Sequence, residues 1–131
     1  MMVTGILKLI LRAEGLALFL ASLVAYYTLG GSWWMFAALI LVPDLSFIGF
    51  MFGPKIGSIA YNTLHSTIGP LLLGSLGWLI DQDNTMHILR DLCSFIALIW
   101  LAHIGFDRAV GYGLKYASAF KDTHLGAIGK N

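Results

Sequence analysis

Four long apolar segments, separated by short breaks, constrain the fold of this chain more than any other feature of its sequence. Each approaches the roughly 20 residues that a helix needs to cross the hydrocarbon layer of a bilayer. Gly30-Gly31, Gly53-Pro54 and the polar loop that begins at Asp81 provide the breaks. We therefore predict an all-α fold, an integral membrane four-helix bundle. Its spans should cover about residues 6–29, 33–52, 56–80 and 86–110 of a transmembrane domain (1–116), followed by a short cytoplasmic tail (117–131).

Composition supports a location in lipid. Of the 131 residues, 58% are hydrophobic and only 11% are charged, whereas a soluble domain carries roughly 25% charged residues. A domain of this length has too little interior to hide so many apolar side chains, so the excess must face the bilayer. The net charge of +1 offers no basic field for nucleic acid. The expected partner is therefore the lipid bilayer, and no nucleic acid.

The basic residues predict the orientation of the chain. Lysine and arginine concentrate in cytoplasmic segments of membrane proteins, and here most of them lie on one side of the predicted layout. We therefore expect both termini to be cytoplasmic in a multi-pass protein of the bacterial inner (plasma) membrane. The exception is Arg90, which we expect to pair with Asp83 or Asp91. The residues on the predicted cytoplasmic side are Lys8, Arg12, Lys55, Lys115, Lys121 and Lys130.

Several polar residues lie inside the predicted spans. An ionisable group at membrane depth costs a few kcal/mol, about 2.5–3.5 on insertion scales, so such groups usually pair, face the bundle interior and mark function. With a rise of about 1.5 Å per residue, all of them fall in the cytoplasmic half of the bilayer. They are Glu14 in the first span, Asp44 in the second, Asn62 and His65 in the third, and His103 and Asp107 in the fourth.

The spacing of these residues favours a metal site. His103 and Asp107 are four residues apart, and Asn62 and His65 are three apart, so each pair projects from one face of its helix. Two imidazoles with one to three carboxylates suit Zn, Mn or Fe. A metal held in this way could activate water for hydrolysis.

A structural interpretation of the same residues stays open. Ion pairs of Arg12 with Glu14, or of Asp107 with Arg108, would make membrane insertion tolerable, and Asn or His side chains can join helices by hydrogen bonds. The chain would then be a non-enzymatic membrane protein. It would serve as a small transporter subunit or a structural partner, with the polar groups packing helices or relaying protons. The oligomeric state is open in both cases.

A set of short motifs spread over nearly the whole chain resembles a family of small bacterial membrane proteins, the domain of unknown function family 4260. This resemblance implies a membrane fold but brings no established activity. The motifs are Arg12-Ala-Glu-Gly15, Gly31-Ser-Trp-Trp34, Pro43-Asp-Leu-Ser46, Gly53-Pro54, Tyr61-Asn62 with His65, His103-Ile-Gly-Phe-Asp-Arg108, Gly111-Tyr-Gly-Leu-Lys-Tyr116 and Phe120-Lys-Asp-Thr-His-Leu-Gly126.

A second, weaker resemblance concerns chemistry. Pro43-Asp44, then His65-Ser66, then His103 with Asp107 is similar to the pattern of membrane-embedded metal-dependent hydrolases, although Ser46 stands where that pattern has a second acidic residue. The resemblance implies that Asp44, His65, His103 and Asp107 are metal ligands. It further implies catalytic roles for Glu14, as a further ligand or general base, and for Asn62, which would orient. A lipid or lipid-linked substrate would suit this depth, with its phosphate held by Arg12, Arg108 or Lys115.

The segment after the last span is short and mixed in charge, and it includes Lys121, Asp122 and His124. We expect a solvated, partly ordered tail here. The alternative is a lid that folds back over the cytoplasmic mouth of the bundle.

Overall fold

The computed structural model describes residues 3, 5–82 and 85–129 and is helical over most of this length. Its elements, in chain order, are α1 (Gly5–Thr28), α2 (Trp33–Leu39), the 3₁₀ helix η1 (Val42–Phe52), α3 (Pro54–His65), α4 (Ile68–Ile80), α5 (His87–Val110) and the two-residue strands β1 (Asp122–Thr123) and β2 (Gly126–Ala127). The predicted all-α class is confirmed.

The helices are long and apolar enough for a multi-pass membrane protein. Residues 5–28, 33–52 and 87–110 each qualify as a span, and α3 with α4 forms a fourth if this pair, bent by 40°, is one broken span. Large apolar side chains point outward along these helices; Trp34 is 87% exposed and Met51 is 83% exposed. A soluble protein rarely shows such a continuous apolar exterior, so lipid is its natural surrounding.

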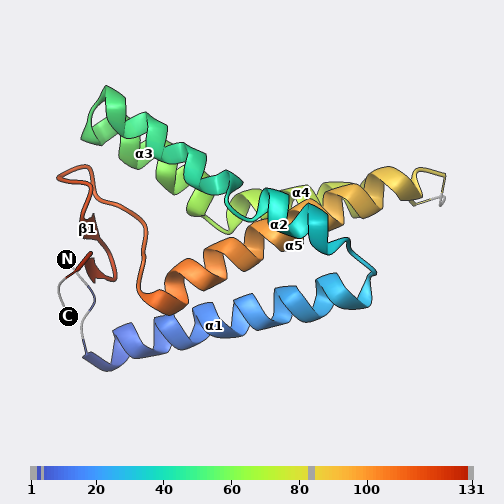
Figure 1. Ribbon diagram of the computed structural model, residues 1–131, viewed down its shortest axis with the longest axis horizontal. Coiled ribbons are helices and arrows are strands. Elements are labelled where there is room, and N and C mark those ends of the chain that lie inside the picture. Colours follow the sequence, from blue (N-terminus) through green and yellow to red (C-terminus); the bar gives the residue numbers. More distant parts are fainter. Residues whose placement is uncertain (1–2, 4, 83–84, 130–131) are drawn as a thin grey trace.

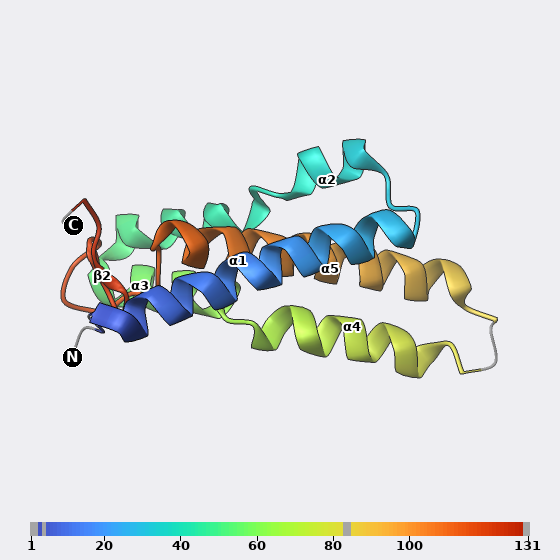
Figure 2. The same ribbon diagram turned by 90° about the horizontal axis from the view of Figure 1, so that it is seen from below.

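Helix α5 forms the centre of the molecule, between α1 and α4 (Figures 1 and 2). The backbones of α1 and α5 approach closely at two glycines. A β-carbon on Gly105 would lie only 2.6 Å from the backbone nitrogen of Phe19, and one on Gly15 would lie 2.6 Å from Cβ of Arg108. Small residues of this kind allow the close backbone contact that drives helix association in lipid.

The second predicted span changes helix type partway. Helix α2 ends at Leu39, and η1 begins at Val42 with Pro43 in its first turn. Proline lacks the N–H that a continuous α-helix needs from its interior residues, which explains why the helix type changes at Pro43. The predicted breaker Gly53-Pro54 is confirmed as the turn between η1 and α3, since Gly53 has a φ of +106°.

The third predicted span contains a break that was not predicted from the sequence. Helix α3 ends at His65 and α4 starts at Ile68, with Ser66 in extended backbone between them. Pro70 lies in the first turn of α4, where proline is tolerated, and it is the signal that could have revealed the restart. As a result η1 and α3 form a helical hairpin that diverges from α1 (Figure 1).

The segment after α5 is more ordered than we expected of a solvated, partly ordered tail, although residues 116–121 are exposed. Strands β1 and β2 pair antiparallel, and Lys115 forms a bridge with Thr123. Thr123 and Leu125 are buried. The backbone N–H of Val3 donates to the carbonyl of His124 over 2.9 Å, so the tail lies against the beginning of α1. Lys130 lies outside the described residues.

At the opposite end of the molecule, Arg90 joins the loop between α4 and α5. Its guanidinium lies 2.8 Å from the buried carboxylate of Asp81 and 2.9 Å from that of Asp91. The expected pair with Asp91 is confirmed, and Asp83 lies outside the described residues. Asp81 also accepts a hydrogen bond from the backbone N–H of Met86, at 2.7 Å.

Candidate metal centre

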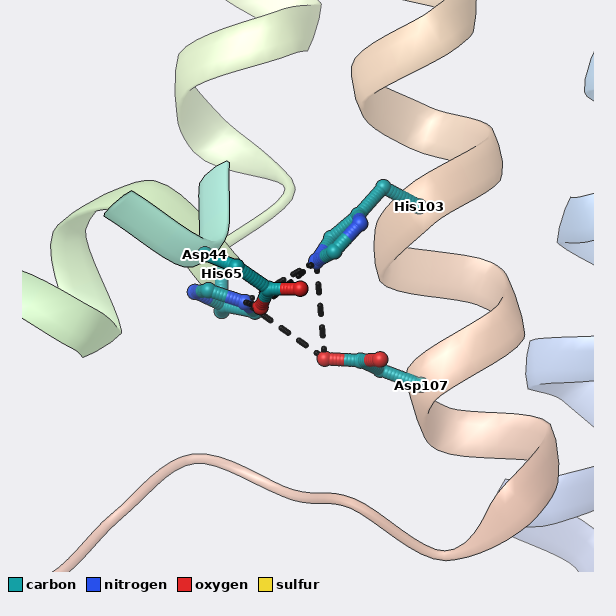
Figure 3. A group of neighbouring side chains, drawn as sticks. All are labelled: Asp44, His65, His103 and Asp107. Carbon is teal, nitrogen blue, oxygen red and sulfur yellow. Dashed lines mark hydrogen bonds and ion pairs between the residues drawn. The ribbon is translucent and has the colours of Figure 1, made fainter. Parts of the chain in front are cut away.

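The structure brings together four of the candidate residues predicted from the sequence: Asp44, His65, His103 and Asp107. Asp44 comes from the start of η1, His65 from the end of α3, and the other two from one face of α5. Each side chain directs one possible ligand atom toward the others, and these atoms all lie within 4.8 Å of one another (Figure 3). The helix breaks at Pro43 and Ser66 therefore flank the two ligands that come from outside α5.

The distances between the ligand atoms fit a single metal ion. The Nε2 atoms of His65 and His103 are 3.1 Å apart. The four distances from these nitrogens to Oδ1 of Asp44 and Oδ2 of Asp107 are 3.4, 3.4, 3.4 and 3.6 Å. Ligands about 2.0–2.2 Å from a tetrahedral ion stand roughly 3.3–3.6 Å from each other. Five of the six distances, 3.1–3.6 Å, lie close to this spacing, so the group could hold one divalent ion.

Tyr61 contacts two of the four clustered side chains, His65 and Asp107. The Nδ1 atom of His65 lies 2.9 Å from the backbone carbonyl of Tyr61. A carbonyl can only accept, so Nδ1 carries the proton and Nε2 keeps its lone pair for the centre. The Tyr61 ring stacks on the His65 ring at 3.6 Å, and its hydroxyl donates to Asp107 Oδ2 over 3.2 Å. No role was predicted for Tyr61 from the sequence; its position four residues before His65, on the same helix face, was the available signal.

The centre is enclosed, with one side more open than the rest. The side chains of His65, His103 and Asp107 are 3%, 4% and 13% exposed, and that of Asp44 is 34% exposed. Two carboxylates beside two neutral imidazoles would leave uncompensated negative charge at membrane depth, which is costly. A divalent cation would cancel it.

A pocket of about 220 Å³ leads to the centre from the side of the tail, and both aspartates contribute to its wall. The tail contributes the opposite wall, so the folded tail covers the approach to the centre. The pocket is lined by Asp44, Phe47, Tyr61, Asp107, Tyr112, Lys115, Phe120 and Ile128. Of the three residues predicted to hold phosphate, Lys115 is the one that lines this pocket.

Lys115 is a buried cation surrounded by aromatic rings. Its Nζ donates to the carbonyl of Phe120 over 2.7 Å and lies 3.8 Å from the ring centre of Phe120 and 4.8 Å from that of Tyr61. The rings of Phe47 and Phe50 are 5.5 and 5.8 Å away. Burial lowers the pKa of Lys115, while the negative charge of Asp107 opposes this shift. Such contacts between a cation and aromatic faces stabilise the ammonium away from water.

Asn62 lies outside the group of four. Its amide donates to the carbonyl of Lys115 over 2.8 Å and accepts from the N–H of Lys115 over 2.7 Å. Both polar atoms of the side chain are therefore used on the backbone of the tail. These contacts are those of a positioning residue, which fixes Lys115 beside the pocket.

Of the other candidates, Glu14 and Arg12 are outside the group of four, and Arg108 lies next to it. Glu14 is exposed on α1 and is absent from the group. Arg12 donates from Nε to the carbonyl of Ala109 over 2.8 Å, and Arg108 lines a small cavity beside Tyr61 and Asp107. The ion pairs of Arg12 with Glu14 and of Asp107 with Arg108, which a structural interpretation invoked, are not formed in the described part of the chain. Ser46 is buried two residues after Asp44 and adds no carboxylate to the centre.

Comparison with known proteins supports the family and no activity. A family model described as a domain of unknown function, DUF4260, matches residues 8–128. This range covers almost the whole chain, so the chain belongs to that family and the first resemblance is confirmed. No curated protein and no solved structure matches the chain. The similarity to membrane-embedded hydrolases stays a prediction from the motifs.

Proposed function

We propose that this member of the DUF4260 family is a membrane-embedded metal-dependent hydrolase with a single-ion centre formed by Asp44, His65, His103 and Asp107. One observation carries the proposal: four potential ligand atoms from three helical elements converge with the spacing of ligands around one ion. The pocket beside the exposed edge of Asp44 gives a substrate access to this point.

A divalent ion in this centre would supply Lewis acidity, polarising the scissile bond and lowering the pKa of water. The chain supplies the rest. His65 and His103 would hold the ion from the buried side, with His65 oriented by the Tyr61 carbonyl. Asp44 contacts both imidazoles through Oδ1, so its Oδ2 remains to accept a proton from water in the pocket.

The coordination number distinguishes catalysis from a purely structural role. Four protein ligands complete the tetrahedron of a structural Zn site, whereas a catalytic site keeps an open position. Mn or Fe accepts additional ligands and would leave positions for water and substrate. Catalysis therefore favours Mn or Fe. A closed Zn site, which would pin η1 and α3 to α5, supports the second candidate function, a non-enzymatic membrane protein such as a structural partner or small transporter subunit.

The proposed location is the bacterial plasma membrane, with both termini and the pocket on the cytoplasmic side. In support, the tail lies at the same end of the molecule as the beginning of α1 (Figure 1). Lys8, Lys55 and Lys121 belong to that end by their positions at the start of α1, at the start of α3 and in the tail. A basic end of this kind is typical of the cytoplasmic face.

The experiment that tests the proposal combines metal content with hydrolysis. Elemental mass spectrometry is applied to the purified wild type and to the variants His65→Ala, His103→Ala and His87→Ala. His87 is exposed at the start of α5 and serves as the matched control. We expect about one ion per chain in the wild type and in the control, and almost none in the other two.

The same four proteins are then loaded with Mn, Fe or Zn and offered p-nitrophenyl phosphate. Release of p-nitrophenol by the wild type and the control, lost in the two ligand variants, would support the hydrolase. Equal metal content in all four proteins would overturn the centre. Bound Zn without hydrolysis would overturn the hydrolase in favour of the helix-pinning role.

A further inference from the structure

A second cavity lies directly beside the proposed centre and is apolar. It has a volume of about 230 Å³, and its wall includes Val42, Pro43, Leu64, Ile96, Ile99 and Trp100. Pro43 and Leu64 immediately precede the ligands Asp44 and His65 in the chain. We call this cavity the acyl groove. Trp100 closes one side, where its indole N–H donates to the carbonyl of Leu64.

The acyl groove and the pocket beside the tail lie at different depths along α5. Groove residues Ile96 to Trp100 precede the ligands His103 and Asp107, and the pocket continues beyond Asp107 toward the tail. From Trp100 to Asp107 a helix rises roughly 10 Å. The centre therefore stands between an apolar cavity toward the middle of the helices and, toward the tail, a pocket in which the charged groups of Asp44, Asp107 and Lys115 lie among aromatic side chains.

The charges around the pocket beside the tail indicate which kind of ligand it binds. The carboxylates of Asp44 and Asp107 sum to −2, a divalent ion contributes +2, and the Lys115 ammonium adds +1, so the loaded site carries a formal charge of +1. Lys115 has three N–H donors and gives one to the carbonyl of Phe120. An anionic group is the complementary ligand. A water-sized group takes up roughly 30 Å³. The pocket of about 220 Å³ therefore has room for a phosphate but for little more of a lipid headgroup.

We infer that the substrate is the phosphate monoester of a lipid alcohol, with its phosphate in the pocket and its apolar chain in the acyl groove. This inference rests on the proposed hydrolase. A lipid of the cytoplasmic leaflet has the same order of chain and headgroup along the membrane normal. In the reaction, the oxygen of water bonds to phosphorus and the ester P–O bond breaks. The lipid oxygen takes one proton of the water, so the products are the lipid alcohol and inorganic phosphate.

Binding of non-hydrolysable phosphonates tests the inference without turnover. Metal-loaded protein in nanodiscs of phosphatidylcholine is titrated with decylphosphonate and with ethylphosphonate, and affinity is measured by calorimetry. We expect decylphosphonate to bind at least tenfold more tightly, because its chain enters the acyl groove. The same titrations without protein correct for partition of the probe into lipid.

Two substitutions on α5 provide a matched comparison. Ile96→Trp fills the acyl groove, whereas Leu98→Trp places the same side chain in a separate groove lined by residues of α1, α4 and α5. Ile96→Trp should remove the advantage of decylphosphonate and leave metal content and ethylphosphonate binding unchanged. Leu98→Trp should bind both probes as the wild type does.

Each outcome separates the two proposals. Equal affinity for the two probes, or an equal effect of the two tryptophan variants, would overturn the lipid substrate while leaving a metal-dependent hydrolase of small phosphate esters. If decyl phosphate and ethyl phosphate both release no phosphate from metal-loaded protein, the hydrolase itself is overturned. Release from decyl phosphate that slows at least tenfold in Ile96→Trp alone would support both.

Discussion

Tyr61 contacts three functional residues of the site: His65, Asp107 and Lys115. Its carbonyl accepts from His65, its hydroxyl donates to Asp107, and its ring lies under Lys115. Loss of a partner that orients a metal ligand typically costs about 10–100-fold in metal affinity. The hydroxyl and the ring can be tested separately, because phenylalanine keeps the stacking on His65 and loses only the bond to Asp107.

Tyr61→Phe should therefore weaken metal binding without abolishing it. We expect a loss of affinity of about 10–100-fold, measured by competition with a chromophoric chelator. Tyr27 is exposed near the end of α1 and is not one of the four clustered residues. Tyr27→Phe should therefore leave metal affinity unchanged. Unaltered metal affinity in Tyr61→Phe would show that the hydroxyl does not support the centre.

At the scale of residues, the sequence predicted the four clustered residues better than the side chains around them. Spacing within α5 placed His103 and Asp107 on one face, and both are in the centre. Glu14 was included because of its depth, yet depth does not determine which way a side chain faces around α1. Lys115 was selected for its charge, but its aromatic surroundings come from η1, α3 and the tail, and no local pattern predicts that contact.

The structural role of His124 in the tail requires its imidazole ring to be neutral. Its Nδ1 accepts a hydrogen bond from the backbone N–H of Leu114 over 2.9 Å, which requires the neutral ring. Burial lowers the pKa of His124, and the positive charge of Arg108 acts in the same direction. Since the folded pKa lies below the unfolded value of roughly 6.5, this contribution to stability is complete above that pH and is lost as the pH falls through the folded pKa.

Acidification should therefore loosen the tail. A nitroxide on Ala117→Cys, in a Cys93→Ala background, should become more mobile by electron paramagnetic resonance as the pH falls from about 7.5 to about 5. Adding His124→Asn should abolish most of this pH dependence, because asparagine does not titrate. A pH response that persists in His124→Asn would assign the effect to another group.

At the scale of elements, the contact between α1 and α5 depends on the absence of side chains. A β-carbon at Gly105 would approach Phe19 N and the carbonyl of Gly15 within 2.6 and 2.8 Å. At Gly74, on the α4 side, it would lie 3.5 Å from Cβ of Ala97, an ordinary contact. The two glycines therefore differ in what a single methyl group would do.

Gly105→Ala should lower the unfolding temperature in detergent, because overpacking costs about 1–3 kcal/mol. Gly74→Ala should leave that temperature unchanged or raise it, since alanine is the better helix residue. Circular dichroism during heating measures both. Equal unfolding temperatures for the two variants would contradict the close contact of α1 with α5.

The elements themselves were predicted unevenly. Apolar length and the breakers Gly30-Gly31 and Gly53-Pro54 located the ends of the main helical segments. The change to a 3₁₀ helix after Leu41 and the extended Ser66 followed from local chemistry around Pro43 and Pro70 that hydropathy does not register. The tail folded because Thr123 and Leu125 find a buried site against the bundle, a tertiary effect outside the reach of local composition.

At the scale of the whole molecule, the apolar exterior and the distribution of lysines predict the topology. Two introduced cysteines can report on which side of the membrane each end of the molecule lies. One replaces Ala117 in the tail, and the other replaces Thr85 between α4 and α5. In whole cells with a Cys93→Ala background, a membrane-impermeant maleimide should label Thr85→Cys and should not label Ala117→Cys until the cells are lysed. The reverse labelling would place the pocket on the outer face.

The central claim is that two histidines and two aspartates hold one ion within the membrane. X-ray absorption spectroscopy at the edge of the bound metal tests this most directly. We predict nitrogen and oxygen ligands at about 2.0–2.2 Å, with the multiple-scattering signature of two imidazoles. Unlike alanine, glutamine at position 65 offers an amide oxygen to the ion, so metal-saturated His65→Gln should show that signature reduced by half. A spectrum with oxygen ligands alone, or one unchanged by His65→Gln, would contradict the proposed centre.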